Sequence, residues 1–134
     1  MDARSFPPEQ ATLTGRPLER LKKRADFLKA ARGVRAVTAS LSLESCPSPK
    51  ASDAIRVGYT ASRKIGGAVQ RNRAKRRLRA AAAAELTLLG RSGNDYVLVA
   101  RPGALTRPFA RLREDLAAAI RSVHQKLEGA KGRS

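Results

Sequence analysis

The residues of this sequence that could do chemistry are mainly arginines and lysines. Between positions 54 and 84 the chain has nine cationic side chains and no carboxylate, and six of the nine fall within residues 71–79. Unpaired positive charge at this density repels itself unless a polyanion supplies the counter-charge. Guanidinium groups bind phosphates through two parallel hydrogen bonds and also stack on bases. The pattern therefore predicts a surface that binds nucleic acid, and RNA in particular.

The charge of the whole chain agrees with this basic block. Its 134 residues include 28 Lys and Arg against 11 Asp and Glu, a formal net charge of +17. An anionic membrane is the other candidate partner, but a membrane-surface helix needs bulky anchors, and the chain has no Trp, three Phe and two Tyr. No apolar run approaches spanning length, and residues 1–10 lack the apolar centre of an export signal. We expect a cytoplasmic protein with no membrane partner.

Residues for protein-borne catalysis or metal binding are sparse. Cys46 is the only cysteine and His124 the only histidine, so a Cys/His zinc site is excluded. A metal-dependent nuclease needs clustered carboxylates, whereas Glu114 and Asp115 are adjacent in a predicted helix and point about 100° apart. The other acidic residues are scattered along different elements. We predict no catalytic residue and no metal ligand in the protein.

Before the basic block, hydrophobic periodicity predicts one helix and two strands. Leu21, Ala25 and Leu28 recur at helical spacing. Apolar and polar residues then alternate, with the period of a strand that is covered on one side. The predicted order is a flexible segment over 1–17, a helix ending near Gly33, a strand over 35–44, a loop over 45–50 and a strand over 55–60.

The basic block itself lies in a predicted helix from Ala68 to about Leu89. A helical projection gathers its apolar residues on one side and spreads the cationic residues over the remaining arc. The apolar side consists of Ala74, Leu78, Ala81, Ala82 and Leu89. A buried strand over 95–100 follows, so that strand, helix and strand form a crossover unit. A last helix begins near Pro108, with a buried stripe of Leu112, Leu116, Ile120, Val123 and Leu127.

Residues 56–79, which read RVGYTASRKIGGAVQRNRAKRRLR, resemble the signature of the bacterial ribonuclease P protein component. Supporting pieces lie on both sides in the same order. Upstream are Leu21-Lys22-Lys23 and Asp26-Phe27, and downstream is the run over 95–103. The resemblance covers about residues 18–127.

The resemblance implies an α+β protein: a small α/β sandwich with an approximately four-stranded sheet, a basic crossover helix and a C-terminal helix. The domain would span 18–128, between flexible segments at 1–17 and 129–134. Such a subunit binds a catalytic RNA and the 5′ leader of precursor tRNA. The RNA, with bound Mg²⁺, would cut the phosphodiester and leave a 5′-phosphate on the mature tRNA. The implied cofactors are thus the catalytic RNA and Mg²⁺ held mainly by that RNA.

The resemblance also assigns roles to individual residues. Phe27 would stack on the single-stranded leader, although a helical Phe by itself is more often a core residue. Ala31 stands where a second aromatic is expected, which would shift more of the leader contact onto Arg63 and Lys64. The residues expected to contact the catalytic RNA are Arg71, Asn72, Arg73, Lys75, Arg76 and Arg79.

Two other classes of protein fit part of the pattern. A ribosomal protein would share the size and charge, but general rRNA binders do not need the continuous block over 71–79. A helix-turn-helix DNA reader needs a short helix directly before its recognition helix, where this sequence predicts a strand. Among single residues, we expect His124 to be a partly exposed structural or surface residue and Cys46 an ordinary loop thiol. Tyr59 suits core packing and a cleft equally well.

Overall fold

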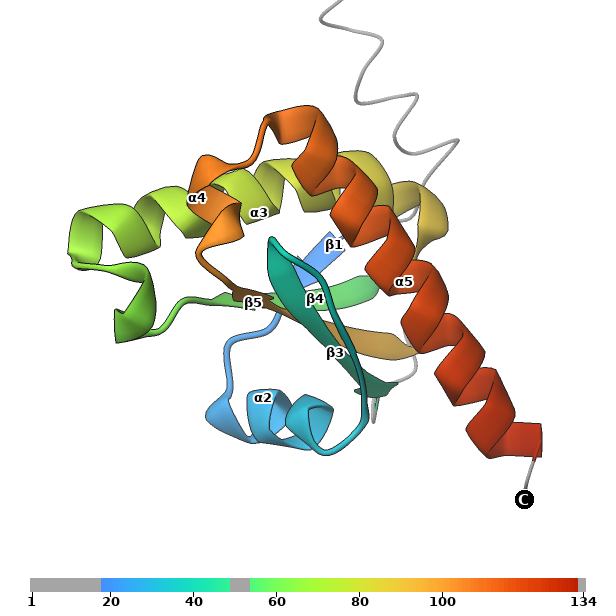
Figure 1. Cartoon of the computed structure of the whole chain (residues 1–134). Helices are drawn as coiled ribbons and strands as arrows, with labels where there is room; N and C mark the ends of the chain where they lie inside the picture. The colour runs from blue at the N-terminus through green and yellow to red at the C-terminus, as the bar shows by residue number, and fades with distance from the viewer. Residues whose placement is uncertain (1–17, 49–53, 133–134) are drawn as a thin grey trace, which may run out of the picture.

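The computed structural model describes residues 18–48 and 54–132, with side chains described as far as Gly129. These residues form one five-stranded sheet with helices on both faces (Figure 1). The elements are, in order, β1 (Leu18–Arg20), α2 (Arg24–Ala31), β2 (Val34–Val37), β3 (Leu41–Pro47), β4 (Ile55–Thr60), η1 (Arg63–Ile65), α3 (Ala68–Leu89), β5 (Asn94–Ala100), α4 (Gly103–Thr106) and α5 (Phe109–Gly132).

The sheet is mixed, with the strand order β1-β4-β5-β3-β2. β4 runs parallel to both of its neighbours, β1 and β5, and α3 makes the crossover from β4 to β5. β3 pairs antiparallel with β5 and with β2. The predicted crossover unit is confirmed, and it places the basic helix beside the centre of the sheet.

The two faces of the sheet are covered unequally. α3, α4 and α5 lie on one face and enclose the main core, whereas only the short helix α2 covers the other (Figure 1). Residues on β4 show the alternation, because Ile55 and Val57 enter the main core while Arg56 and Gly58 face α2. The α2 face has a smaller apolar cluster of Leu21, Ala30, Cys46 and Val97, with Phe27 and Val99 packed at its edge.

The prediction for the basic helix is confirmed at both ends and on its core face. Ala74, Leu78, Ala81 and Ala82 are buried, and Leu86 joins them where the sequence predicted Leu89. Leu89 packs against the core from its margin. The stripe on α5 is confirmed at Leu112, Leu116, Ile120 and Val123, which are all fully buried, whereas Leu127 is only half-buried.

The prediction for the first helix is wrong in its length and in its buried face. Residues Leu18–Arg20 form strand β1, and α2 begins only at Arg24. Ala25 and Leu28 are exposed, and Ala30 is the buried residue of the helix. β1 is stabilised by pairing with β4, more than thirty residues away along the chain, and such long-range pairing leaves no local periodic signal.

The single strand predicted over 35–44 is two strands, β2 and β3. The Thr38 hydroxyl oxygen accepts hydrogen bonds from the backbone N–H groups of Ser40 and Leu41, and its O–H donates to the Leu41 carbonyl. This local bonding turns the chain back on itself. β3 then continues to Pro47, into the predicted loop. The division of 35–44 and the added β1 raise the three strands predicted from periodicity to five, against the approximately four implied by the resemblance.

The structure does not test the prediction that the terminal segments are flexible. Residues 1–17 lie outside the described part of the chain, and α5 continues to Gly132, past the predicted domain end. Within the described residues, no helix is both long and apolar enough to cross a membrane.

Candidate nucleic-acid interface

The first half of α3 displays the predicted RNA-binding residues on the surface away from the core. Asn72, Arg73 and Arg76 are exposed, and Arg71, Lys75 and Arg79 are half-buried. We call these six residues the basic ridge. In this stretch of α3 only Ala74 and Leu78 are buried in the core. The cationic side chains can therefore occupy the rest of the helix surface.

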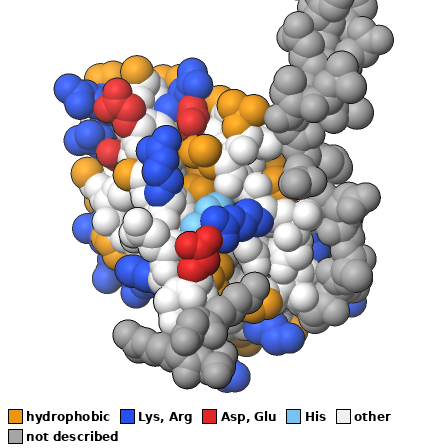
Figure 2. All heavy atoms as spheres, turned by 90° about the vertical axis from the view of Figure 1, so that its right-hand side faces the viewer, with side chains coloured by type: hydrophobic (Ala, Val, Ile, Leu, Met, Phe, Trp, Pro, Cys, Tyr) orange, Lys and Arg blue, Asp and Glu red, His pale blue; other side chains and the backbone are white. Residues whose placement is uncertain are grey.

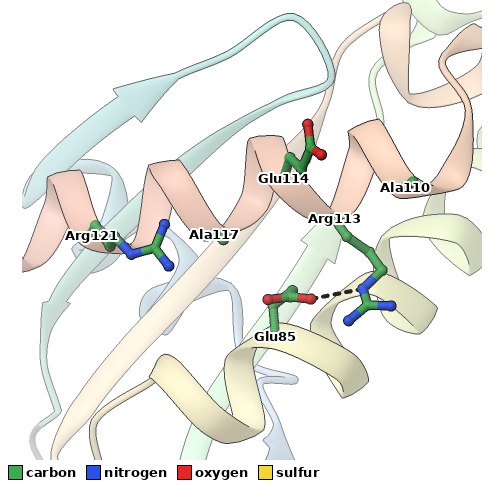
Figure 3. Close-up of a pocket in the computed structure, with 6 residues that line it drawn as sticks. All are labelled: Glu85, Ala110, Arg113, Glu114, Ala117 and Arg121. Atoms are coloured by element: carbon green, nitrogen blue, oxygen red, sulfur yellow. Dashed lines mark hydrogen bonds and ion pairs between the residues drawn. The ribbon is translucent and has the colours of Figure 1, made fainter.

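No acidic side chain of α3 balances the basic ridge. The one carboxylate of the helix, Glu85, lies in its second half and accepts a hydrogen bond of 2.7 Å from Nε of Arg113 on α5 (Figure 3). Glu85 and Arg113 line a pocket between α3 and α5, together with Glu114 and Arg121. Mixed charge of this kind is also seen on the face in Figure 2, where acidic and basic side chains lie next to one another. Among the described residues, no ion pair engages the basic ridge.

Arg79 differs from the other residues of the ridge, because its guanidinium carbon lies 5.9 Å from the centre of the Tyr59 ring. Burial raises the pKa of the Tyr59 hydroxyl to about 12, while the positive charge of Arg79 acts in the opposite direction. Tyr59 packs at the edge of the main core, so the core role is the one the structure supports. The cation–π contact orients Arg79 beside the end of β4.

Arg63 and Lys64 lie in the short helix η1, directly between β4 and α3, and both are exposed. The Ser62 hydroxyl oxygen caps this turn by accepting from the Lys64 N–H at 3.3 Å. Gly66 then adopts a φ of 141°, a conformation that L side chains rarely adopt, and the chain turns into α3. The two cations therefore immediately precede the basic ridge along the chain.

Phe27 lies on α2, on the opposite face of the sheet from α3 (Figure 1). Its ring is half-buried and covers Gly58 so closely that a Cβ at Gly58 would lie 2.5 Å from Cζ of the ring. The structure thus separates the predicted site into two surfaces. One is the basic ridge on α3, and the other is the α2 face, with Phe27 at the edge of its apolar cluster.

The family model for ribonuclease P matches residues 16–124. The chain belongs to the ribonuclease P protein family. The ribonuclease P protein component of Ruegeria pomeroyi is 45% identical over 121 residues, which cover 89% of this chain and 97% of that protein. That of Caulobacter vibrioides is 46% identical over 110 residues, covering 82% and 74% respectively.

Solved ribonuclease P proteins share the fold. The Staphylococcus aureus protein superposes with a TM-score of 0.63 at 26% identity, covering 76% of this chain and 92% of that one. The Thermotoga maritima protein gives 0.61 at 26% identity, covering 73% and 91%. The predicted family and α+β class are confirmed, and the chain is a protein subunit of ribonuclease P. The ribosomal alternative is not favoured.

One residue of this ribonuclease P subunit was missed by the sequence reasoning. Arg56 on β4 is 5% exposed, and acidic side chains from three other segments surround its guanidinium group. The alternation over 55–60 puts Arg56 on the polar side of the predicted strand, so no local signal indicated its burial beneath α2. The three carboxylates belong to Glu19, Asp26 and Asp95.

Asp95 is the most deeply buried of these acids, with no exposed surface. Burial raises the pKa of the Asp95 carboxyl, while the positive charge of Arg56 and a hydrogen bond from Ser48 act in the opposite direction. The guanidinium of Arg56 supplies positive charge to these carboxylates. Within residues 18–48 and 54–132, no group of three or more His, Cys, Asp or Glu side chains is placed to hold a metal.

His124 and Cys46 of the ribonuclease P subunit are both buried, whereas the sequence predicted a partly exposed histidine and a loop thiol. His124 is only 7% exposed, and its Nε2 lies 2.7 Å from the Tyr96 hydroxyl. Burial lowers the pKa of His124, and the nearby charge of Arg91 lowers it further. Cys46 is buried in β3 rather than in a loop, and burial raises the pKa of its thiol.

Proposed function

We propose that the basic ridge of this ribonuclease P subunit binds the catalytic RNA of the enzyme, and that the α2 face binds the 5′ leader of precursor tRNA. The RNA subunit, with its bound Mg²⁺, hydrolyses the phosphodiester between leader and tRNA and leaves a 5′-phosphate on the tRNA. The protein increases affinity for the precursor by holding the leader. We expect this activity in the cytoplasm.

The observation that carries the proposal is the uncompensated charge of the ridge. Arg73 and Arg76 are exposed, and each can place a planar fork of N–H donors on a phosphate. The amide of Asn72, directly before Arg73 in the sequence, can both donate to and accept from a ribose hydroxyl. A helix surface of this kind follows an RNA backbone without reading its sequence.

The leader role of the α2 face is supported by Phe27 and by the cations around it. Phe27 is half-buried, so part of its ring remains accessible to a base. Exposed Lys22, Lys23 and Lys29 on and before α2 add positive charge for the leader phosphates. Ala31 is exposed, at the position where a second aromatic was expected.

The division of labour between protein and RNA is supported by the chemistry of the described side chains. Arg56 pairs with Glu19, Asp26 and Asp95, so these acids are matched to a guanidinium rather than to Mg²⁺. We therefore assign Mg²⁺ to the RNA subunit. The chain contributes binding and orientation, while hydrolysis takes place on the RNA.

Reconstitution of the protein with a bacterial ribonuclease P RNA tests the proposal. At low Mg²⁺ concentration, where the RNA alone binds precursor tRNA weakly, we expect the protein to stimulate cleavage at the junction between leader and tRNA. The protein without RNA should not cleave. Correct cleavage by the purified protein alone would overturn the assignment of chemistry to the RNA, and a lack of stimulation would overturn the assignment of the subunit's role.

A further inference from the structure

Arg56 joins four separate segments of the chain on the α2 face of the sheet. One of its terminal nitrogens donates to Oδ2 of Asp26 in α2 at 2.7 Å. The other donates to the Ser48 hydroxyl at 3.2 Å and lies 3.5 Å from Oδ2 of Asp95 in β5. Its Nε lies 3.9 Å from Glu19 in β1. The shortest of these ion pairs is the one that joins β4 to the helix.

α2 has few other means of fixing its orientation. The helix is eight residues long, Ala30 is its one fully buried side chain, and Lys23 at its N-cap makes no side-chain capping bond. Leu28, the large aliphatic residue of the helix, is 49% exposed. A helix this short, with so little buried apolar surface, gains limited stability from its own turns. The partly buried Asp26–Arg56 pair is therefore the polar contact that, with the packing of Ala30 and Phe27, restricts its rotation against the sheet.

The same orientation places the Phe27 ring. Phe27 follows Asp26 in the chain, and Gly58 follows Arg56 by two residues on the same face of β4. When Asp26 binds Arg56, the ring of Phe27 lies over Gly58, where there is no Cβ to displace it. The adjacent side chains of Asp26 and Phe27 thus contact Arg56 and Gly58, which are consecutive positions on one face of β4.

We propose that Arg56 is a positioning residue for precursor-tRNA recognition: its bond to Asp26 sets the rotation of α2 that holds Phe27 over Gly58 in the orientation that receives a leader base. This inference rests on the proposed role of Phe27 in leader binding. Arg56 does not touch the leader. It acts through the helix, because its side chain is buried and all its polar contacts given above are within the protein.

Two substitutions with opposite effects on net charge test the proposal in the reconstituted holoenzyme. Arg56→Met removes a positive charge and Asp26→Asn removes a negative one, yet both abolish the charge–charge contact between these two side chains. We measure affinity for precursor tRNA with a leader of about six nucleotides and for the same tRNA with a single-nucleotide leader. Arg91→Met, which breaks the surface ion pair with Glu128, is the control for loss of an arginine.

Both variants should reduce the preference for the long leader by about ten-fold, because one stacked base is lost, while affinity for the short leader changes little. General electrostatics predicts the opposite result for Asp26→Asn, whose higher positive charge would strengthen binding to either RNA. Arg91→Met should retain the wild-type preference. Combining Arg56→Met with Phe27→Ala should give no loss beyond that of Phe27→Ala alone.

The outcomes distinguish a failure of the positioning role of Arg56 from a failure of the proposed leader-binding function. If Phe27→Ala does not change leader preference in the wild-type background, the leader role of Phe27 fails, and the positioning role fails with it. If Phe27→Ala lowers the preference but Asp26→Asn does not, only the positioning role is overturned. If Arg56→Met does not fold, Asp26→Asn still decides the question, because it keeps the side-chain shape and leaves Arg56 with Asp95 and Ser48.

Discussion

Neighbouring arginines on α3 differ in exposure and in hydrogen bonding, although the sequence does not distinguish them. Arg76 is exposed, whereas Arg77 is half-buried and donates to the carbonyls of Ala104 and Arg107 at 2.6 and 2.5 Å. Arg79 lies against the Tyr59 ring. Helical periodicity predicts which residues of α3 lie outside the core. It does not predict that Arg77, rather than Arg76, makes hydrogen bonds to the segment that includes α4.

Replacing Arg73 and Arg76 together by Ala should weaken the salt dependence of RNA binding. If the ridge neutralises about six phosphates, the wild-type log–log slope of affinity against salt is about −4 to −5, and the double variant should flatten it by about one to two. Titrations at several salt concentrations measure this slope. The matched control is Arg111→Ala with Arg121→Ala on α5, which removes the same charge. A slope that is the same in both double variants would rule out direct phosphate contact by Arg73 and Arg76.

Arg77→Ala should instead destabilise the fold. It leaves the carbonyls of Ala104 and Arg107 without their charged donor, which should lower the free energy of unfolding by about 1–3 kcal/mol. Denaturant unfolding measures the loss, and Arg76→Ala, one residue away and exposed, should show almost none. Equal stability of the two variants would mean that the bonds to α4 contribute nothing net.

At the scale of elements, the sequence predicts best where one element repeats a pattern over many residues. α3 and α5 each bury a regular apolar stripe, and both were predicted close to their observed limits. β1 has only three residues and exists through its pairing with β4. The turn between β2 and β3 was missed because apolar and polar residues alternate on both sides of Thr38 as they would in one strand.

The attachment of α5 to β5 should depend on pH through His124. The Tyr96 hydroxyl accepts from the Arg91 N–H at 3.0 Å, and its O–H can donate to Nε2 of His124, 2.7 Å away, when that ring is neutral with Nε2 unprotonated. Since the pKa of His124 is lower in the folded state, the unfolded state binds more protons below about pH 6.5. Stability should thus fall as the pH drops through this range.

Unfolding measured between neutral and mildly acidic pH checks this expectation. His124→Gln keeps an oxygen that can accept from Tyr96 but cannot titrate, so its stability should vary less over the same interval. An unchanged pH dependence in this variant would show that other groups cause it. Tyr96→Phe should lower stability at neutral pH, because His124 would lose its buried partner.

At the scale of the whole molecule, the sheet separates two surfaces that the sequence could not place relative to one another. The basic ridge lies on the α3 face, and Phe27 lies on the α2 face (Figure 1). Arg63 and Lys64 lie where the chain leaves β4 for α3. A protein with this arrangement can contact two RNA segments at once, and we propose that these are the catalytic RNA and the leader.

Mg²⁺ should have little effect on the free protein. With Arg56 among the carboxylates of Glu19, Asp26 and Asp95, added Mg²⁺ should leave the thermal unfolding temperature of the protein unchanged, beyond what an equal ionic strength of NaCl causes. Cleavage by the reconstituted holoenzyme should still require Mg²⁺. A specific rise in the unfolding temperature with Mg²⁺ would indicate a protein-borne site.

Charge density, helical periodicity and a contiguous signature are local properties of the chain, and they were enough to predict the basic helix, its core face and the family. The three-dimensional packing was needed to establish that Leu18–Arg20 is a strand, which side of α2 faces the sheet, and that Arg56 meets Glu19, Asp26 and Asp95. These features depend on contacts between residues far apart in the chain. Such contacts are selected by the packing of the whole sheet and leave no periodic trace within any one segment.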